Sequence, residues 1–528
     1  MLIHFGLFFA VGMSRHWGYM SSINDLGIFN QVVWNTLNGE FLRTTINPFG
    51  MSINWLGFHF QPILLLFVPL YRLYPGVAWF VAAQAMALAF TAWPIFLITK
   101  HLLKSVKVGF AWALVYLLNP FLLSAGTWDF HPITLAVPFI ATGLLAVVKK
   151  NSRMLICSSL VILTCKEHLG LLVAGLGALW WIRNRSWKIA ALVSSLGICY
   201  LVLVMGVLMP WFSPIGKPIM LGDGLGQLSR YSWLGGSASE IMHSFLTRPG
   251  YIWQQVVKMG GPVYWLLLLT PYGLVLPILG FPFLLPGLVD IAANTMSLNP
   301  MPRGWSYHSA VLVPIFTVAA IAGVEWMSRI QRRYSAKELS GLILTVALIY
   351  GFLFMPLPLK GAFDIWAPVN RFNWRAESKL QEVRSSVAGG VSLSAQANIG
   401  AHFSQRHEIF LYPNKAGKTD GVVLRLASPT TNINHSANTS HKHSKSWVPN
   451  WLEGHLQMDR TEYLASIVCL LKKKEYGIAY WDDPWLVLVR EGKGEQHGVE
   501  RKIQLLREEW QVDRDEYLSA LAQCMADR

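Results

Sequence analysis

The sequence predicts an α-helical polytopic membrane protein with a small soluble α/β domain at its C-terminus. Of the 528 residues, 53% are hydrophobic and only 14% are charged, which is not the composition of a soluble domain of this size. Apolar runs recur through the first two thirds of the chain, and most approach the roughly 20 residues that a helix needs to cross a bilayer. Beyond residue 359, charged and polar residues become frequent and shorter strand-like segments appear.

The apolar runs predict a path with about eleven crossings, counted by the length that a crossing requires. After a short first run that ends near residue 13, they occupy residues 77–99, 108–124, 133–148, 155–182, 189–212, 263–290, 308–327 and 342–357. The count of eleven requires that the prolines within residues 263–297 split that segment into two short helices. An apolar but proline-containing segment, residues 58–74, is expected as an interfacial helix in a first external loop of residues 14–75.

Basic clusters between the runs indicate the orientation. They lie at residues 100–107, 149–153, 183–188 and 329–337. Short loops rich in Lys and Arg favour the cytoplasmic side, so the N-terminus is expected in the cytoplasm and, with an odd number of crossings, the C-terminal region outside. The formal net charge of +15 is therefore read as membrane topology, and no nucleic-acid partner is expected.

The expected domains are a transmembrane domain of residues 1–359 and an extracytoplasmic α/β domain of residues 360–528. Strands are predicted at residues 391–394, 409–412, 421–426, 477–481 and 485–490, because these segments are short, apolar and bounded by turn residues. Apolar residues at helical spacing predict one helix over residues 499–525. The five cysteines show no CxxC or zinc spacing, and no disulfide framework is expected.

Lys166 and Glu167 are adjacent charges inside the apolar stretch of residues 155–182. Both flanks of this stretch are basic, so the chain is expected to enter the membrane, turn at residues 165–168 and return. Ionisable residues at membrane depth are costly and usually line a site. The alternative is an internal Lys166–Glu167 salt bridge that holds a helical hairpin together.

The predicted path places further polar residues in short loops on the external face. They are Arg15, His16, Asp25, His59, Asp129, His131, Arg303 and His308, in addition to Lys166 and Glu167. If these loops converge, they form a wet cavity that suits a phosphorylated lipid, because cations neutralise phosphate and a carboxylate can act as a base or bind a divalent ion. Helix capping by Asp25 and a loop hydrogen-bond pair of Asp129 and His131 are the competing explanations.

Several motifs in a fixed order resemble the prokaryotic membrane-protein family known as domain of unknown function 2079. They are Arg15-His16, Asp25-Leu26-Gly27-Ile28-Phe29-Asn30-Gln31, Trp34-Asn35-Thr36, Gly57-Phe58-His59-Phe60-Gln61-Pro62, Asp129-Phe130-His131-Pro132, Lys166-Glu167, Tyr307-His308, Val391-Ser392-Leu393-Ser394-Ala395-Gln396 and Ser404-Gln405-Arg406. The resemblance spans nearly the whole chain. The chain departs from the family at Asn30, where Asp is frequent, and at Ser309, where Tyr is common.

That family is similar in layout to the fold type C glycosyltransferases, which take a sugar from a polyprenyl-phosphate donor at the extracytoplasmic face. The resemblance implies an integral protein of the cytoplasmic (inner) membrane whose partners are a lipid-phosphate sugar donor and an acceptor in the cell envelope. It gives Asp25 the acidic role, as a base or as ligand to a metal such as Mg²⁺ or Mn²⁺, with Glu167 as the second catalytic candidate. Lys166, His131 and Arg303 would neutralise phosphate, beside Arg15, His16, His59, Asp129 and His308 as further substrate-binding candidates. The alternative function is a transporter or flippase for a lipid-linked or anionic solute, although the sequence shows no convincing internal repeat.

Overall fold

The computed structural model describes residues 1–47, 49–221, 229–304, 306–330, 334–354, 377–428, 451–490, 492, 494 and 496–526. The chain divides into two compact units. Unit 1 comprises Met1–Gly12, Trp55–Leu65 and Trp79–Pro368, and unit 2 comprises Met13–Asn54, Leu66–Ala78 and Val369–Arg528. The predicted domain boundary between residues 359 and 360 lies outside the described residues and stays a prediction.

Unit 1 is helical, and among the described residues five helical stretches are long and apolar enough to cross a membrane. They are Ala78–Leu103, Pro132–Lys149, Trp187–Phe212, Leu312–Ile330 and Ala336–Leu353. A pair bent by 51°, Val106–Leu117 with Pro120–Thr127, raises the number to six if it forms one span. The predicted count of eleven crossings is therefore not confirmed, because several apolar runs form helices shorter than a full crossing, including α1 (Leu2–Trp17).

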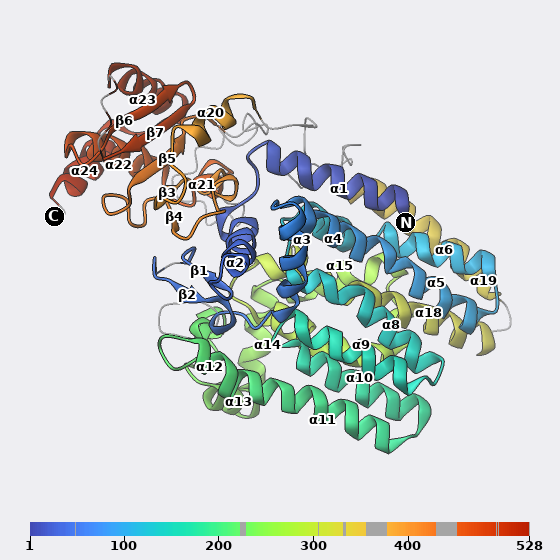
Figure 1. The fold of residues 1–528 in the computed structure, drawn as a ribbon. Helices are drawn as coiled ribbons and strands as arrows, with labels where there is room; N and C mark the ends of the chain where they lie inside the picture. Colours follow the sequence, from blue (N-terminus) through green and yellow to red (C-terminus); the bar gives the residue numbers. More distant parts are fainter. Residues whose placement is uncertain are drawn as a thin grey trace. The chain divides into compact units, whose positions relative to one another are not determined.

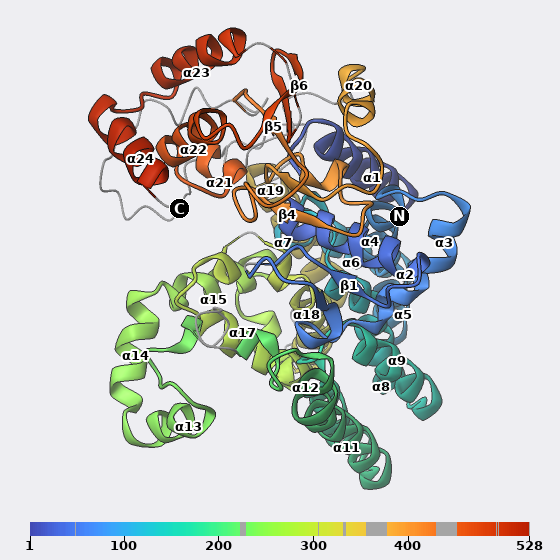
Figure 2. The same ribbon diagram turned by 60° about the vertical axis from the view of Figure 1, so that its left-hand side comes forward.

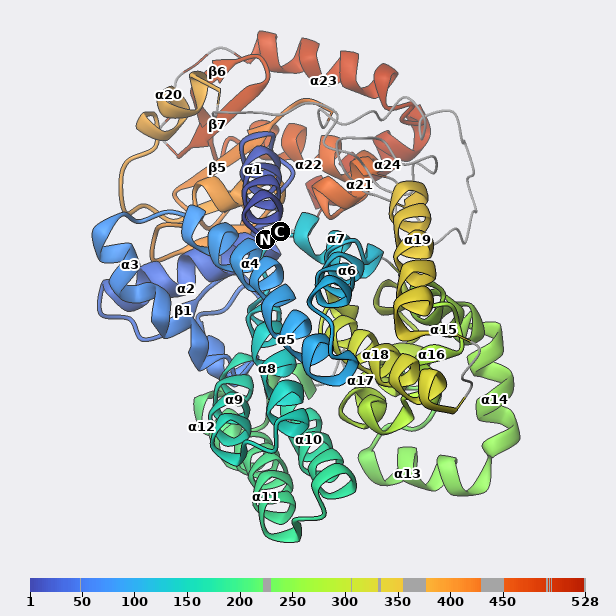
Figure 3. The ribbon, with the colours of Figure 1, turned by 90° about the vertical axis from the view of Figure 1, so that its right-hand side faces the viewer.

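The predicted turn at residues 165–168 is present. Helix α9 (Ser152–Cys165) ends immediately before Lys166, and α10 (Leu169–Asn184) begins after His168. Helix α10 then packs along α11 (Trp187–Leu203), as Figure 3 shows. Their backbones approach so closely that a Cβ added at Gly170 would lie 2.5 Å from the carbonyl oxygen of Gly197, so only glycine fits at this crossing.

The proline-rich segment near residues 263–297 is split, as predicted, but into more pieces than two. It forms α15 (Gly261–Leu269), a 3-10 turn at Thr270–Tyr272, α16 (Leu276–Leu279), the 3-10 helix η9 (Phe281–Gly287) and α17 (Leu288–Met296). Proline lacks the N–H that an α-helix needs in its interior, so each proline favours the end of one helix and the beginning of another. Helix α16 and η9 pack against the long helix α18 (Leu312–Ile330).

Unit 2 contains a five-stranded sheet whose strands all lie at positions predicted from the sequence. The strand order is β4 (Ile409–Leu411), β3 (Leu393–Ala395), β5 (Gly421–Arg425), β7 (Trp485–Val489) and β6 (Gly477–Asp482). Strand β3 pairs in parallel with β4 and β5, whereas β7 pairs antiparallel with β5 and β6. Figure 2 shows this sheet together with α22 (Arg460–Lys472) and α23 (His497–Glu509).

The prediction of one helix over residues 499–525 is wrong. Helix α23 ends at Glu509, and a separate helix, α24 (Arg514–Ala526), follows. Between them Gln511 has a φ of 52°, which breaks the helical path, and the side chain of Asp513 accepts hydrogen bonds from the N–H groups of Asp515 and Glu516. An Asp that caps the next helix is a start signal, which the apolar periodicity concealed.

The segment that was predicted as the first external loop divides between the units, and its larger part belongs to unit 2 together with the C-terminal sheet. It carries α2 (Ile28–Leu37), and the short helices η3 (Pro62–Phe67) and α3 (Val68–Leu73) follow in the expected interfacial segment. Figure 1 draws α2, β1 (Arg43–Thr44) and β2 (Ile53–Asn54) in the blue part of the chain. The interfacial role stays a prediction.

Asn30 on α2 joins this loop to the C-terminal region within unit 2. Its amide nitrogen donates to Ser404 Oγ at 2.7 Å and to the Ala401 carbonyl at 3.2 Å, and its amide oxygen accepts from the Tyr71 hydroxyl at 2.8 Å. A carboxylate accepts but does not donate, so an Asp could not satisfy both of the first two partners. The network therefore requires a side chain that donates as well as accepts, which Asn provides and an ionised Asp does not.

No disulfide framework was expected, but the structure contains a disulfide. Cys469 on α22 is bonded to Cys524 on α24, at a sequence separation of 55 residues. The two helices pack against each other, which brings the thiols together. No local spacing motif encodes such a pair, so it could not be predicted from the positions of the cysteines.

Replacing Cys469 by Ser is expected to destabilise unit 2 by about 2–4 kcal/mol, because the cross-link restricts the unfolded chain. The measurement is the denaturant midpoint of the purified protein without reductant. The control is Cys157→Ser, which removes an exposed free thiol and should leave the midpoint unchanged. Equal midpoints for the Cys469→Ser and Cys157→Ser variants would contradict a stabilising cross-link.

Candidate functional site

Glu167 is held by residues of another loop of unit 1. Its Oε1 lies 2.9 Å from His59 Nδ1, and its Oε2 accepts the N–H of Phe60 at 3.1 Å. The side chains of His59 and Glu167 are only 12% and 2% exposed. Burial lowers the pKa of His59, so at neutral pH the contact is a hydrogen bond between a neutral imidazole and the Glu167 carboxylate. Among the described residues, the alternative of a direct Lys166–Glu167 salt bridge is not formed.

The Glu167 carboxyl group is ionised at neutral pH. Burial raises its pKa, but the charge of His59, the hydrogen bond from His59 and the neighbouring Lys166 together outweigh burial and lower the pKa to about 2. The pair leaves His59 Nε2 without a partner among the described residues. A carboxylate that fixes one imidazole nitrogen and leaves the other open is an arrangement suited to proton transfer.

Lys166 follows the end of α9 in an extended conformation, with φ −167° and ψ 147°. Its ammonium group makes no hydrogen bond or ion pair within the described part of the chain. Burial lowers its pKa, the charge of Arg230 lowers it further, and Glu167 and Asp290 oppose this. A half-buried ammonium group that is disfavoured by the charge of a guanidinium group, and that has no acceptor among the described residues, would be stabilised by an anion.

Two histidines extend this cluster. His168 Nε2 lies 3.2 Å from Asp290 Oδ1, in the first turn of α17. His308 has a pKa well below its ordinary value because of burial and because of the charges of Lys166, Arg230, His131 and His168. We call Lys166, His168, Arg230, Asp290 and His308 the Lys166 cluster.

Arg230 and Asp290 were not predicted as site residues. Asp290 stands at the end of the apolar run of residues 263–290, where it was counted as part of a crossing, and it is buried in the fold. Arg230 follows the glycine-rich residues 222–226, which lie outside the described residues. The signal for Asp290 was available, because a charge in an apolar run is costly.

Asp129 and His131 form a compact loop that partly matches the alternative of a hydrogen-bond pair. His131 Nδ1 lies 2.9 Å from the backbone carbonyl of Asp129, and Gln84 Oε1 accepts the His131 N–H at 3.1 Å. The His131 ring stacks on Tyr307 with centroids 3.4 Å apart, and Tyr307 stacks on His308 at 4.2 Å. This stack brings His131 and His308 to the two faces of one tyrosine.

The Arg303 side chain donates hydrogen bonds to backbone carbonyl groups. Its Nη1 donates to the carbonyls of Asn294 and Thr295, at 3.2 and 3.3 Å, and to that of Ser297. These carbonyls end α17, so the guanidinium group caps that helix. Its predicted role in phosphate binding stays a prediction.

The remaining predicted residues, Arg15, His16 and Asp25, belong to unit 2. Arg15 Nη2 donates to the Met20 carbonyl at 3.2 Å, and His16 Nδ1 lies 3.0 Å from Ser21 Oγ. Asp25 lies in the first turn of a short π-helix, Ile23–Gly27, whose N-cap is Ser22. Asp25 is therefore not the capping residue, and its catalytic or metal-binding role stays a prediction.

Metal binding was a further expectation. Among the described residues no group of three or more His, Cys, Asp and Glu is placed to hold a metal ion. The expectation of Mg²⁺ or Mn²⁺ at Asp25 stays a prediction.

Comparison with known proteins yields one family. A family model described as predicted membrane protein, DUF2079, matches residues 15–444. A search of curated proteins finds no match. The match covers the loop with Asp25, the His59 and Lys166 loops and the strands β3 to β5.

Proposed function

The chain belongs to the DUF2079 family of predicted membrane proteins, and from this premise we propose that it is a glycosyltransferase-like membrane enzyme. It takes a sugar from a polyprenyl-phosphate donor and transfers it to an acceptor on the extracytoplasmic face. The observation that supports this proposal most directly is the Lys166 cluster of unit 1.

The Lys166 cluster has the chemistry of a phosphate site. The positive charge of Arg230 lowers the pKa of Lys166, because like charges repel each other. Two such cations in one half-buried place are stabilised when an anion lies between them, and charge-assisted hydrogen bonds to phosphate are the strong kind. A phosphate leaving group also gains negative charge during transfer, so the same cations would lower the barrier.

His59 and Glu167 supply the proton-transfer element. The buried carboxylate orients the imidazole through Nδ1, and Nε2 can take the proton of an acceptor hydroxyl. Glu167 then acts as a positioning residue for His59. Asp25 in unit 2 is the second candidate base and rests on the family resemblance.

The Cys469–Cys524 disulfide supports the predicted orientation of unit 2. Disulfides persist in oxidising compartments such as the periplasm and the cell surface, and they are rare in the cytosol. A disulfide in the C-terminal region agrees with an extracytoplasmic position.

Replacing Lys166 by Ala is expected to weaken the binding of polyprenyl phosphate about 10- to 100-fold, as for the loss of one charge-assisted hydrogen bond. The measurement is a titration of the purified protein in detergent micelles, followed by tryptophan fluorescence. The matched control is Lys188→Ala, which removes an exposed lysine at the start of α11 and should keep the wild-type affinity. Equal affinities for the two variants would overturn the assignment of Lys166.

Transfer itself is tested with a radiolabelled polyprenyl-phosphate sugar in proteoliposomes. Asp25→Asn and Lys166→Ala should each abolish labelled product while the protein remains inserted in the membrane. Movement of intact labelled lipid across the bilayer, at wild-type rates in both variants, would instead establish the transporter or flippase function.

A further inference from the structure

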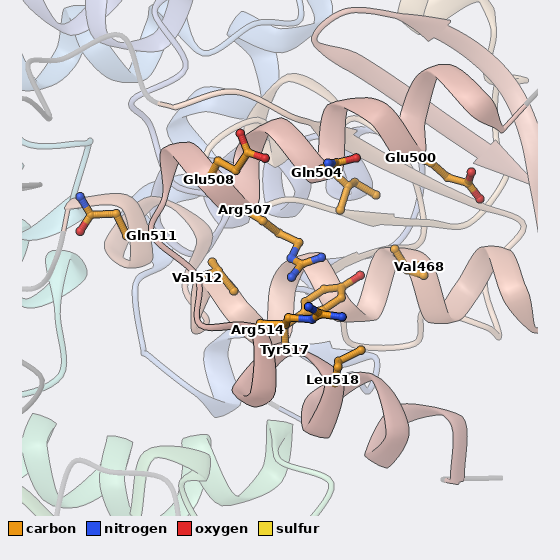
Figure 4. A pocket seen from close by; sticks show the side chains of 11 residues that line it. Val468, Glu500, Gln504, Arg507, Glu508, Gln511, Val512, Arg514, Tyr517 and Leu518 are labelled. Carbon is orange, nitrogen blue, oxygen red and sulfur yellow. The ribbon is translucent and has the colours of Figure 1, made fainter.

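Unit 2 contains a hollow between its last three helices that the proposed function does not use. Its volume is about 660 Å³, and it lies among α22, α23 and α24. Ligand sites for small molecules have roughly 300–1,000 Å³. Figure 4 shows Arg507 of α23 and Tyr517 of α24 at its centre.

Arg507 is the unusual residue of this hollow. Its guanidinium carbon lies 4.1 Å from the centroid of the Tyr517 ring, and its Nε is buried without a hydrogen-bond acceptor. Within the described part of the chain Arg507 makes no ion pair. A guanidinium group has five N–H donors, and a buried donor without an acceptor costs stability, so this side chain is prepared for a ligand with oxygen acceptors.

The surroundings of Arg507 define the class of ligand. Val468, Ile503 and Leu518 contribute apolar walls, and Arg514 adds a second guanidinium group near the Tyr517 ring. Glu500 and Glu508 also border the hollow, but in Figure 4 both carboxylates lie away from the Tyr517 ring. The lining therefore combines cationic donors and an aromatic ring with apolar surface.

We propose that this hollow binds a small organic anion, in which a carboxylate or phosphate group meets Arg507 and an apolar part lies against Val468, Ile503 and Leu518. A planar guanidinium group matches the two oxygens of such an anion in a bidentate manner. The ligand is either a free solute or the headgroup of an anionic lipid, which share this chemistry.

The test uses phenyl phosphate and benzoate as probes, titrated calorimetrically into the full-length protein in neutral detergent micelles. Wild type should bind at least one probe saturably, and Arg507→Gln should lower that affinity about ten-fold or more. The matched control is Arg501→Gln, which removes an exposed arginine of the same helix and should keep the wild-type affinity. The affinity of Arg507→Lys should lie between those of wild type and Arg507→Gln, because lysine keeps the positive charge but lacks the planar guanidinium group that binds two oxygens.

Absence of saturable binding of both probes to the wild-type protein would overturn the proposal, as would equal affinities of Arg507→Gln and Arg501→Gln. Retention of the Cys469–Cys524 disulfide on non-reducing gels verifies that the variants fold. Competition by a soluble short-chain phosphatidic acid supports the proposal with a lipid headgroup as the source. Probe binding without such competition supports it with a free solute.

Discussion

Replacing Glu167 by Ala is expected to destabilise unit 1 by about 1.5–3 kcal/mol, the value of a hydrogen bond to a charged group, because the buried carboxylate accepts such bonds from His59 and Phe60. The substitution leaves the N–H of Phe60 without its acceptor and His59 without its carboxylate. It also removes the negative charge that raises the pKa of Lys166 most, so the half-buried ammonium group loses its main stabilising charge. The measurement is the thermal unfolding midpoint of the purified protein in detergent micelles.

The matched control for this prediction is Glu325→Ala. Glu325 makes an ion pair with Arg329 one turn away on α18; its own side chain is 13% exposed, but that of the arginine is 75% exposed, so solvent screens the pair. Such helical surface pairs contribute only about 0.3–0.5 kcal/mol, so the midpoint should hardly change. Equal shifts of the midpoint by both substitutions would show that the buried hydrogen bonds of Glu167 do not stabilise unit 1.

Local patterns predicted the local structure well. The five strands of unit 2, the turn after Cys165 and the interruption of residues 263–297 follow from alternation, charge and proline, which act within a few residues. The break at Gln511 was not predicted, because Trp510 and Val512 continue the apolar spacing although the positive φ of Gln511 ends the helix. Short-range periodicity carries no information on such a backbone reversal.

Pairing between distant segments could not be predicted. Glu167 and His59 are 108 residues apart, and Cys469 and Cys524 are 55 apart, so no spacing motif connects either pair. The sequence identified Lys166 and Glu167 as a candidate site from the cost of charge in an apolar stretch, and a direct salt bridge between them was the alternative. The tertiary fold supplied His59 as the partner of Glu167, whereas the Lys166 ammonium group has no such partner among the described residues and is disfavoured by the like charge of Arg230.

Acidification is expected to destabilise unit 2 through two stacked histidines. His16 and His402 are buried with ring centroids 3.9 Å apart, and His402 Nε2 lies 2.8 Å from the His16 carbonyl. Burial, with the charge of Arg384, lowers the pKa of His16 from 6.5 to about 3, and burial, with His16 and Arg384, lowers that of His402 well below 6.5. Arg384 also donates to the His402 carbonyl, and Tyr19 packs edge-on against the His402 ring.

The sign of the effect follows from proton binding. Below pH 6.5 the unfolded chain protonates both imidazoles while the folded unit keeps them neutral, so stability is complete above pH 6.5 and falls as the pH decreases toward 3. Each histidine contributes about 1.4 kcal/mol per pH unit in that window, so the pair lowers the stability by about 4 kcal/mol at pH 5. The measurement is the unfolding midpoint of unit 2 in denaturant at pH 8, 6 and 5.

The variant His402→Phe separates this effect from general acid sensitivity. Phenylalanine keeps a ring for the stack but does not titrate, so the variant should lose only about half of the pH-dependent stability. At pH 8 it should be less stable than wild type by about 1 kcal/mol, because the hydrogen bond to the His16 carbonyl is gone. At pH 5 the order should reverse, because the variant escapes the cost of keeping a buried imidazole neutral, which there exceeds the value of one hydrogen bond. Parallel losses of stability in both proteins from pH 8 to pH 5 would show that the acid response of unit 2 arises elsewhere.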